Sequence, residues 1–401
     1  MQIVEQNITI VGAGPAGLSL ALFLAKAKIP HSLIEKGIFP KDKTCSGIIT
    51  PECIKALQKI DPKHAEELIE ADWASPTYSI HFSEGRHKLE IDISNKTRST
   101  IPLSIATKRK DFDTWLFSKL NPSYSSFMPE ARVIAAVRKG KKVELKVETK
   151  KGAVLIRTDL VIGTDGVKSV IRKSLHPNGN EIKSNHHVLA IRQNWAGVAC
   201  PQGRPLEMFT LDRPYPISTY VFYHKNGEAV VGIGTTKKSV QRYKVNLNAE
   251  LKNFLSSDPL ISKRFKNASP LEDAKGWGIP LNTDGKTIAG DHFLLIGDAG
   301  RFADRSFAKG IGTAMLGAES AAEVIAECVA TSNYSKELLT QYQNKIEKRF
   351  RAEWRMLAIL EQLSSSKIFR ILLSKFLSTE VVNKFIERKT AANLEQYLKV
   401  K

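Results

Sequence analysis

Three glycines near the start of the chain have the type and spacing of a nucleotide-binding turn. Gly12, Gly14 and Gly17 follow directly on the apolar run 8–11, and helical apolar spacing continues over 18–27. The first glycine permits a tight strand-to-helix turn, the second lets the backbone approach a pyrophosphate, and the third lets the helix pack on the sheet. Unpaired N–H groups at a helix N-terminus favour phosphate. The pattern therefore predicts dinucleotide binding.

An acid stands where such a turn requires one. A second apolar run, 32–34, ends at Glu35, whose carboxylate can accept hydrogen bonds from ribose hydroxyls. Taken alone, the turn and this acid allow NAD as readily as FAD. The sequence has one strand-linked glycine motif of this kind, so a second dinucleotide has no dedicated domain.

The loop after Glu35 carries a cysteine, Cys45, ahead of a predicted helix over 51–60. A thiol on a loop can donate a proton or lie against a cofactor ring as a small, soft group. It can equally be an inert, packed small side chain, and the residues leave both interpretations open. The four cysteines (Cys45, Cys53, Cys200 and Cys328) form no C-x-x-C pair and no metal spacing with histidine. We therefore expect a reduced setting, no disulfide frame and no metal.

Two further strand ends carry aspartates. The run 159–163 leads to Asp165-Gly166, and the run 293–296 leads to Gly297-Asp298. Ligands collect at the carboxyl ends of strands in a doubly wound sheet. Ahead of both segments, Arg109 stands at the entrance of a helical stretch, where a guanidinium can bind a pyrophosphate in a bidentate way or cap its own helix.

These motifs, in this order, resemble the geranylgeranyl reductase-like flavoproteins of the para-hydroxybenzoate hydroxylase-like group of FAD enzymes. The segment Phe39-Pro40-Lys41-x-Lys43-x-Cys45-Ser46-Gly47 is similar to the family's Lys-x-x-Cys-Gly-Gly, which lies beside the isoalloxazine ring, and either Lys41 or Lys43 can supply the lysine. The segment Arg109-x-x-Phe-Asp resembles a family motif whose arginine contacts FAD. The resemblance implies FAD as cofactor, with these binding residues: Gly12, Gly14, Ala16, Gly17, Glu35, Lys36, Lys43, Cys45, Ser46, Arg109, Val133, Asp165, Gly166, Gly297, Asp298, Gly310, Ile311 and Gly312.

The remaining motifs match with some departures. Around Asp165-Gly166 the family shows Gly-Ala-Asp-Gly-x-x-Ser-x-x-Arg, and this chain has Thr164 in place of the alanine. After Gly297-Asp298, whose aspartate meets the ribityl chain in the family, the usual Asp-Pro-x-x-Gly-x-Gly becomes Asp304-Arg305-x-x-Ala308-Lys309-Gly310. A helix then follows over 313–328, and its N-terminal dipole would favour negative charge on reduced flavin.

The substrate region departs further from the family. Geranylgeranyl reductases tend to carry Tyr-x-Trp-x-Phe-Pro ahead of a hairpin, and this chain offers Thr219, Val221, Tyr223 and His224 at those positions when it is aligned on Lys225. The prenyl-binding signature is thus largely absent. The halogenase string Trp-x-Trp-x-Ile-Pro is absent as well. Substrate and reaction therefore stay open.

The order of the elements predicts an α/β fold. We expect a doubly wound, Rossmann-like FAD-binding domain (1–75, 104–180 and 275–332), an inserted antiparallel-sheet substrate domain (76–103 and 181–274) and a C-terminal helical region (333–401). A hairpin is expected within 77–105, with its second strand at 88–93. Asn226-Gly227 predicts a type I′ hairpin, and 248–265 is expected to be helical. Six aromatic residues of this region line an apolar cavity or form sheet-face core: Trp195, Phe209, Tyr215, Tyr220, Phe222 and Tyr223.

The chain has 401 residues and a formal net charge of +19. No module interleaves basic and aromatic residues, so we expect no nucleic-acid partner, and the basic stretch 138–152 indicates a hairpin with a solvated face. A basic, amphipathic helix from Ser366 either rests on a membrane surface or packs on its own protein. No apolar run is long enough to span a membrane, and the first strand leaves no room for a signal peptide. We expect a cytoplasmic protein, with peripheral contact at the inner face of a membrane as an open alternative.

The resemblance leaves three functions open. In the first, reduced FAD delivers hydride from N5 to a C=C bond of an apolar, isoprenoid- or polyene-like substrate, and Cys45 is the candidate acid. In the second, the flavin activates oxygen and the protein hydroxylates an aromatic or polyene substrate. In the third, the chain is a degenerate, non-catalytic flavin-binding protein. NAD(P)H docking transiently, or a reduced protein, would supply electrons.

Overall fold

The computed structural model describes residues 2–85, 87–94, 101–176, 183–282, 286–305 and 308–364, together with 384, 386 and 390. The chain forms two compact units. Unit 1 comprises 1–42, 110–182 and 280–358, and unit 2 comprises 43–109, 183–279 and 359–401. The structure thus groups 43–75 with unit 2, whereas the sequence analysis placed them in the FAD-binding domain. The domain boundaries remain a prediction, since compactness does not show which residues bind which ligand.

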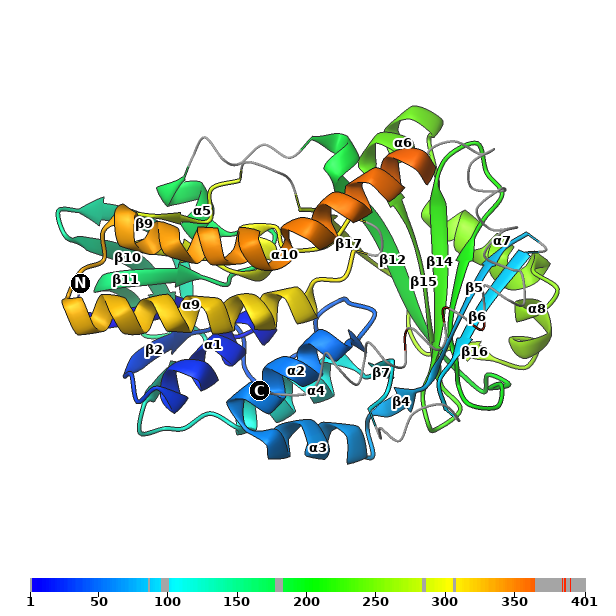
Figure 1. Ribbon diagram of the computed structural model, residues 1–401, viewed down its shortest axis with the longest axis horizontal. Helices are drawn as coiled ribbons and strands as arrows, with labels where there is room; N and C mark the ends of the chain where they lie inside the picture. The colour runs from blue at the N-terminus through cyan, green and yellow to red at the C-terminus, as the bar shows by residue number, and fades with distance from the viewer. Residues whose placement is uncertain are drawn as a thin grey trace. The chain divides into compact units, whose positions relative to one another are not determined.

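Unit 1 is built on a sheet with the strand order β18-β19-β11-β1-β2-β8, in which β19, β11, β1, β2 and β8 are parallel. Figure 1 labels β2, β9, β10 and β11 of this sheet. The antiparallel β9 and β10 extend it beside β11. Its strands are β1 (Gln2–Val11), β2 (His31–Ile34), β8 (Ser125–Met128), β9 (Arg132–Lys139), β10 (Lys142–Thr149), β11 (Gly152–Gly163), β18 (Ala289–Gly290) and β19 (Phe293–Leu295). Its helices are α1 (Pro15–Lys26), α4 (Arg109–Ser118, whose first residue belongs to unit 2), α5 (Val170–Leu175), η3 (Gly297–Gly300), α9 (Ile311–Thr331) and α10 (Lys336–Ser364, whose last turns extend past unit 1).

The first strand is longer than its apolar run. Residues 8–11 are buried, as expected, but β1 begins at Gln2, because 2–6 pair in register with 154–158 of β11. Residues 2–7 are exposed or half-buried, so apolar spacing could not reveal them. The helices α1 and α9 pack against each other, and both are dominated by small and apolar buried residues. The expected α/β architecture is confirmed.

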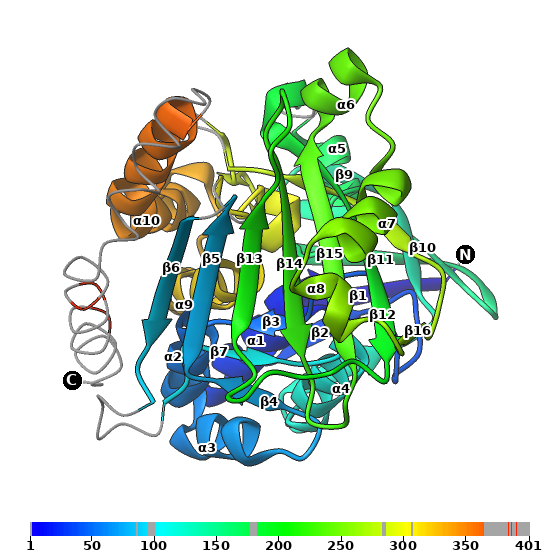
Figure 2. The same ribbon diagram turned by 90° about the vertical axis from the view of Figure 1, so that its right-hand side faces the viewer.

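Unit 2 contains a second large sheet, with the order β16-β12-β15-β14-β13-β5-β6, while β17 also pairs with β12 (Figure 2). Its members are β5 (Ser79–Glu84), β6 (His87–Asp92), β12 (His187–Ala196), β13 (Leu206–Thr210), β14 (Ile217–Tyr223), β15 (Ala229–Thr236), β16 (Ser269–Pro270) and β17 (Lys275–Pro280). The predicted hairpin is β5–β6. The sheet is mainly antiparallel, but β13 and β5, which come from separate parts of the chain, are parallel.

The hairpin between β14 and β15 is present, but its turn differs from the predicted type I′. The backbone closes between His224 and Glu228 (N to O 2.8 Å), which leaves a three-residue loop. Gly227 has a positive φ of 73°, whereas Asn226 has none. A type I′ turn needs a positive φ at both central residues, so the turn prediction is wrong. The longer loop uses only the glycine for the left-handed position.

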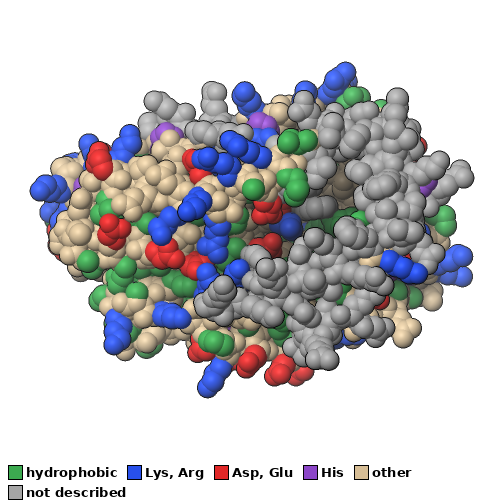
Figure 3. All heavy atoms as spheres, in the orientation of Figure 1, with side chains coloured by type: hydrophobic (Ala, Val, Ile, Leu, Met, Phe, Trp, Pro, Cys, Tyr) green, Lys and Arg blue, Asp and Glu red, His purple; other side chains and the backbone are tan. Residues whose placement is uncertain are grey.

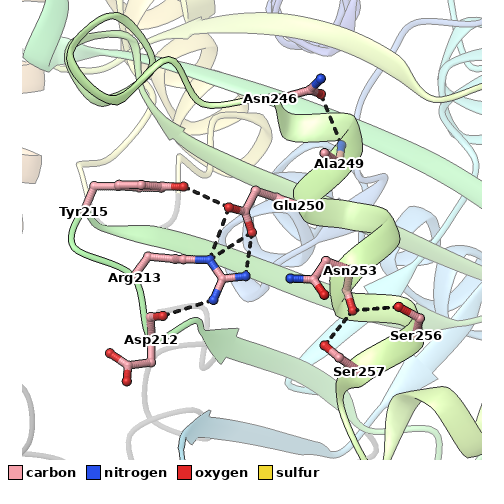
Figure 4. Close-up of polar contacts among 9 residues, drawn as sticks. All are labelled: Asp212, Arg213, Tyr215, Asn246, Ala249, Glu250, Asn253, Ser256 and Ser257. Carbon is pink, nitrogen blue, oxygen red and sulfur yellow. Dashed lines mark hydrogen bonds and ion pairs between the residues drawn. The ribbon is translucent and has the colours of Figure 1, made fainter.

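One face of this sheet is covered by α7 (Leu247–Ser257) and α8 (Ile261–Arg264), and α6 (Lys237–Tyr243) follows the end of β15 (Figure 2). Val221, Ile233, Leu251 and Phe254 form part of their common core. Figure 4 shows how α7 is fixed: the Glu250 carboxylate accepts hydrogen bonds from the Arg213 guanidinium (2.8 Å) and the Tyr215 hydroxyl (2.8 Å). The predicted helix 248–265 is therefore present but divided before α8.

The opposite face of the sheet carries a smaller layer. A three-stranded sheet has the order β3-β7-β4, and two helices accompany it. These elements are β3 (Ile48–Ile49), α2 (Pro51–Ile60), α3 (Pro62–Glu70), β4 (Ser75–Thr77) and β7 (Ser104–Ala106), and η2 (Ser184–His186) precedes β12. The helix α2 has the predicted bounds. Ile48 and Ala106 pack in one apolar cluster with Phe222 of β14.

The positive charge on α10 is partly offset by ion pairs. Arg349 binds Glu319 (2.8 Å) and Lys345 binds Glu323 (2.7 Å), both on α9. On the face shown in Figure 3, Lys and Arg side chains stand beside Asp and Glu side chains. The predicted amphipathic helix from Ser366 lies outside the described residues. Within the described part of the chain, no helix combines the length and apolarity needed to cross a bilayer.

Candidate active site

The glycine turn of unit 1 has the geometry that its spacing predicts. The Gly12 N–H donates to the Ile34 carbonyl (2.8 Å), and its φ of 105° suits only glycine. A Cβ on Gly17 would lie 2.0 Å from the Gly12 oxygen, so this position must lack a side chain. A Cβ on Gly14 would meet no protein atom within 4 Å. A side chain is therefore excluded at Gly12 and Gly17, whereas the space beside Gly14 is open.

Two helix N-termini lie beside this opening. Gly297 has Ala16 of α1 and Ala314 of α9 on either side, 3.2 and 3.3 Å from the position of a Cβ. Gly14 and Gly310 are the N-cap residues of α1 and α9, and no side chain caps either helix. The first-turn N–H groups and the helix dipoles therefore favour anionic groups at this place. The arrangement fits the pyrophosphate and the electron-rich ring of a flavin dinucleotide.

Glu35 is buried at the carboxyl end of β2. Its carboxylate accepts hydrogen bonds from the Ala13 N–H (2.7 Å), the Gly37 N–H (2.9 Å) and the Lys41 ammonium (2.5 Å). Burial alone would raise the pKa of Glu35, but Lys41 and the two N–H donors outweigh it and hold the pKa below its usual value. The acid is therefore ionised, and its oxygens retain capacity to accept a ribose hydroxyl.

Thr164 and Arg172 join the strand ends of unit 1. The Thr164 hydroxyl lies within hydrogen-bond distance of the carbonyls of Val11 (2.8 Å) and Gly12 (2.6 Å), to which it donates, and it ties β11 to the glycine turn. Arg172 donates to the Ala299 carbonyl (2.6 Å) and so ties α5 to η3. Neither was predicted as a site residue. The signal for Thr164 was its departure from the family's alanine.

Asp165 and Asp298 have different surroundings. The Asp165 carboxylate accepts from the Val170 N–H (2.6 Å) at the start of α5, and burial raises its pKa. It thus caps α5, which is a structural role that the sequence reasoning did not assign. Asp298 is half-buried, and one of its oxygens lies 3.6 Å from the position of a Cβ on Gly310. It is therefore placed beside the N-terminus of α9.

The segment 304–310, which departs from the family motif, is joined at its two ends by hydrogen bonds between Asp304 and Lys309. Buried Asp304 accepts from the Lys309 N–H (3.0 Å), and its own N–H donates to the Lys309 carbonyl (3.1 Å). Ala308, which stands where the family has glycine, has a φ of 53°. The backbone is therefore left-handed at an alanine, a residue that rarely adopts this conformation.

Unit 2 holds the predicted cysteine loop. Cys45 is a free, half-buried thiol on a loop, as expected. The next glycine, Gly47, has a φ of 77°, and its carbonyl accepts from the N–H (2.9 Å) and the hydroxyl (2.8 Å) of Thr107. Ile48 and Ile49 then pair with β7. The loop is consequently fixed at its downstream end.

The sheet register brings further residues to this layer. Arg192, Gly232, Tyr220, Met208 and Phe82 are cross-strand partners in one row over β12, β15, β14, β13 and β5. Because side chains alternate along a strand, they share the face that lies away from α7. Most of this face is apolar. We call these five residues the open-face row. Tyr220 is the member of the row whose hydroxyl could take part in proton transfer.

The same alternation sorts the six predicted aromatic residues. Tyr220 and Phe222 share the face of the open-face row and stack with centroids 4.6 Å apart. Trp195, Phe209, Tyr215 and Tyr223 lie on the face covered by α7 and are core or packed against it. Phe222 is also a buried core residue, with Tyr220 packed against its cluster, so the interpretation as sheet-face core applies on both faces.

The remaining predicted residues are scattered over both units. In unit 1, Lys36 is exposed, Val133 is buried in β9 and Gly166 has a φ of 78° after β11. In unit 2, Lys43 lies over the Trp277 ring (5.7 Å) and Arg109 is buried at the first residue of α4. Each unit therefore contributes predicted residues.

The family described as "FAD binding domain" matches residues 5–357. A digeranylgeranylglycerophospholipid reductase from Methanococcus vannielii is 26% identical over 368 residues, covering 86% of this chain and 83% of that protein. A geranylgeranyl bacteriochlorophyll reductase-like protein from Thermoplasma acidophilum has a similar structure, with a TM-score of 0.83 at 18% identity over 99% of both chains.

A flavin-dependent halogenase is also similar, with a TM-score of 0.74 at 17% identity over 99% of this chain and 71% of that one. At these identities the structural likeness shows the fold alone. The sequence matches confirm the resemblance to geranylgeranyl reductase-like flavoproteins. Because the family match spans most of the chain and agrees with the glycine turn and helix N-termini of unit 1, this chain belongs to the FAD-binding-domain family and is an FAD-dependent oxidoreductase.

Proposed function

We propose that this enzyme reduces carbon–carbon double bonds of an apolar, isoprenoid-like lipid. The observation that carries the proposal is the placement of the Cys45 loop. Its downstream strand, β3, packs through Ile48 on an apolar cluster that contains Phe222, Met208 and Ile80. The Cys45 loop thus leads directly into an apolar layer of the kind that a polyene chain would bind.

We also propose how FAD is held. The N–H groups at Ala16 and Gly17 would bind the pyrophosphate across the open side of Gly14, and Glu35 would accept from the ribose. Asp298 would meet the ribityl chain, with the α9 N-terminus at Gly310–Gly312 beside the ring. Bound FAD, once reduced, supplies the hydride. The open side of Gly14 and the two uncapped helices support this assignment.

The chain's own contribution to the chemistry would be the proton. Hydride addition to one carbon of a double bond leaves the other carbon as a base, and a thiol can protonate it. The apolar cluster around Ile48 and Phe222 would keep water from the reacting bond. The loop bonds from Thr107 to Gly47 would hold Cys45 in place during the reaction.

The substrate class is supported by the relatives. Several matching proteins are named digeranylgeranylglycerophospholipid reductase, so a polyprenyl glycerophospholipid is the substrate to test first. The expected electron donor is NAD(P)H, bound transiently, or a reduced protein. The test should therefore not depend on the physiological donor.

The experiment uses the purified holoenzyme, anaerobically, with dithionite as reductant and a digeranylgeranyl glycerophospholipid in detergent. The expected products gain about two mass units for each reduced bond, which mass spectrometry of the lipid resolves. Cys45→Ala should lower the rate about a hundredfold and leave FAD bound, in line with the usual contribution of a positioned acid. Cys200→Ala removes an exposed thiol and is the matched control.

Two results would contradict the proposal. A lipid that is unchanged without oxygen but gains about sixteen mass units with it would identify a hydroxylase, the alternative to which the halogenase-like fold also corresponds. An unchanged rate in Cys45→Ala would show that the thiol only packs. Reduction with the expected mass gain, lost in Cys45→Ala and kept in Cys200→Ala, supports the proposal.

A further inference from the structure

The turn that carries Asp298 in unit 1 contains a strained residue. Arg301, which follows η3, is buried and has a φ of 58°, in the left-handed region that residues other than glycine rarely adopt. Its N–H donates to the Asp298 carbonyl (3.2 Å), and the N–H of Phe302 donates to the Gly297 carbonyl (3.1 Å). Because backbone strain persists only where the surroundings over-determine it, further groups must hold this turn.

Lys286 is one of these groups. Its ammonium donates to the Arg301 carbonyl (2.8 Å) and to the Asn282 side-chain oxygen (2.5 Å). Arg301 is thus bonded at both of its polar backbone groups, through the N–H to Asp298 and through the carbonyl to Lys286. Asn282 is itself buried, and its N–H donates to the Ala303 carbonyl (2.8 Å). The lysine therefore joins Asn282 to the turn that carries Asp298.

Two aromatic rings fix the position of the ammonium. Lys286 Nζ lies 4.7 Å from the centroid of the Phe302 ring and 4.4 Å from that of the Trp354 ring on α10. Rings at such distances attract a cation. The Phe302 ring is tightly packed in turn, since a Cβ on Gly300 would lie 2.7 Å from it and a Cβ on Gly317 of α9 would lie 2.5 Å from it. The ammonium consequently has a defined place over the turn.

The same turn leads to the N-terminus of α9. The Thr313 hydroxyl, in the first turn of this helix, donates to the Phe302 carbonyl (3.0 Å). One Asp298 oxygen lies 3.6 Å from the position of a Cβ on Gly310, the N-cap residue. This is where the proposed placement of FAD brings the ribityl chain. Neither the sequence motifs nor that placement gives a role to Lys286.

We propose that Lys286 is a positioning residue whose ammonium, held over the Phe302 and Trp354 rings, binds the Arg301 carbonyl and thereby keeps Asp298 at the N-terminus of α9. Its consequence for FAD binding rests on the proposed function, in which Asp298 meets the ribityl chain. The hold on the turn itself is a property of the protein alone. It can therefore be measured without flavin or substrate.

The first measurement is amide hydrogen exchange of residues 297–303 in the full-length, flavin-free protein. Lys286→Met keeps an apolar side chain against the two rings and removes the ammonium. Because the Arg301 carbonyl then loses its donor, the turn should open more often, and the amides of Arg301 and Phe302 should exchange about tenfold faster, the worth of one hydrogen bond from a charged group. Lys286→Arg keeps a cationic donor that also attracts aromatic rings, and it should restore most of the protection.

The second measurement is FAD affinity, by fluorescence titration of the same variants. Lys286→Met should weaken FAD binding about tenfold, and Lys286→Arg should weaken it less. Asp298→Ala should also weaken binding, and the double variant should lose less than the two single losses together, because the lysine acts through the aspartate. Lys345→Met is the matched control: it removes a lysine of α10 that pairs with Glu323, and it should change neither exchange nor affinity.

Each outcome supports or overturns the inference. Unchanged exchange in Lys286→Met overturns it, as does an equal acceleration in Lys345→Met. Exchange in Lys286→Arg as fast as in Lys286→Met also overturns it, since the cation would then be irrelevant, and so do fully additive losses of FAD affinity. If Asp298→Ala binds FAD as the parent does, the proposed placement of FAD fails, and faster exchange in Lys286→Met alone still upholds the hold on the turn. Failure of the enzyme to reduce the lipid affects neither measurement.

Discussion

The two large sheets of this protein differ in the groups that we assign to function: these are mainly backbone groups in unit 1 and side chains in unit 2. In unit 1 the strand ends present mainly backbone: the turn at Gly12 and Gly14 and the uncapped N-termini of α1 and α9. In unit 2 the sheet presents side chains in its middle, where Tyr220 depends on the register of β14 against β15. Backbone groups are specified by where glycine occurs, whereas a side chain on a sheet face is specified by pairing partners far away in the sequence. The two regions should therefore respond differently to substitution and to pH.

The largest effect is expected at Gly17, where helix α1 meets the turn. In Gly17→Ala the new Cβ would lie 2.0 Å from the Gly12 carbonyl oxygen, a backbone atom that cannot turn aside as the end of a flexible side chain could. We expect a loss of about 3 kcal/mol or more in the free energy of unfolding of the flavin-free protein, measured in urea. An unfolding midpoint equal to that of the parent would show that backbone packing does not limit this turn.

In unit 2 a buried histidine at the end of β14 should make stability depend on pH. Burial, helped by the nearby Lys108 ammonium, lowers the pKa of His224 to about 4. The unfolded chain, with an ordinary pKa near 6.5, takes up the proton first, so stability is complete above about pH 6.5 and is lost as the pH falls toward 4. The loss should approach about 3 kcal/mol.

Hydrogen exchange of the β14 and β15 amides between pH 4 and 7 measures this loss within unit 2. In His224→Asn, which has no titrating group at this position, the same amides should show a flatter dependence on pH. If parent and variant change in parallel over this range, another group is responsible and the assignment to His224 fails.

Gly14 should separate cofactor binding from folding. Its Cβ would meet no protein atom within 4 Å, so Gly14→Ala should unfold at nearly the same urea concentration as the parent when FAD is absent. If the pyrophosphate passes over this residue, the extra methyl group should weaken FAD binding about tenfold or more, as measured by fluorescence titration of the flavin-free protein. Unchanged affinity would place the pyrophosphate elsewhere, and Gly17→Ala serves as the contrasting variant.

The difference between backbone groups and side chains on a sheet face also explains which features could be predicted from the sequence. The glycine turn, Glu35, the Cys45 loop and the bounds of α2 could all be predicted, because each depends on residues close together in the chain. The extension of β1 to Gln2 could not, since its outer residues gain their order from β11. Tyr220 was named only as one of six aromatic residues, because parity along β14 and the partner Gly232 are fixed by the tertiary register. Asp165 was identified by its motif, but its cap on α5 needed the fold.

At Ala308 a left-handed backbone position is occupied by a residue other than glycine, and its substitution has the smallest predicted effect. Its φ of 53° is a conformation that costs an L-residue about 1 kcal/mol, so this turn is under backbone strain. Ala308→Gly should relieve that strain, less the entropy that glycine adds to the unfolded chain, for a net gain of roughly 0.5 kcal/mol. Ser332 at the end of α9 has a similar φ of 50°, and Ser332→Gly is the matched control at a helix end rather than before the α9 N-terminus. Denaturation of both variants should show similar small gains in the free energy of unfolding.

The flavin absorption spectrum of the two variants tests whether this segment also affects the cofactor. If the spectrum changes only in Ala308→Gly, the backbone before α9 contacts the ring and the alanine influences its absorption. If both spectra stay the same, the effect of Ala308 is confined to local backbone strain, and the alanine does not influence the flavin.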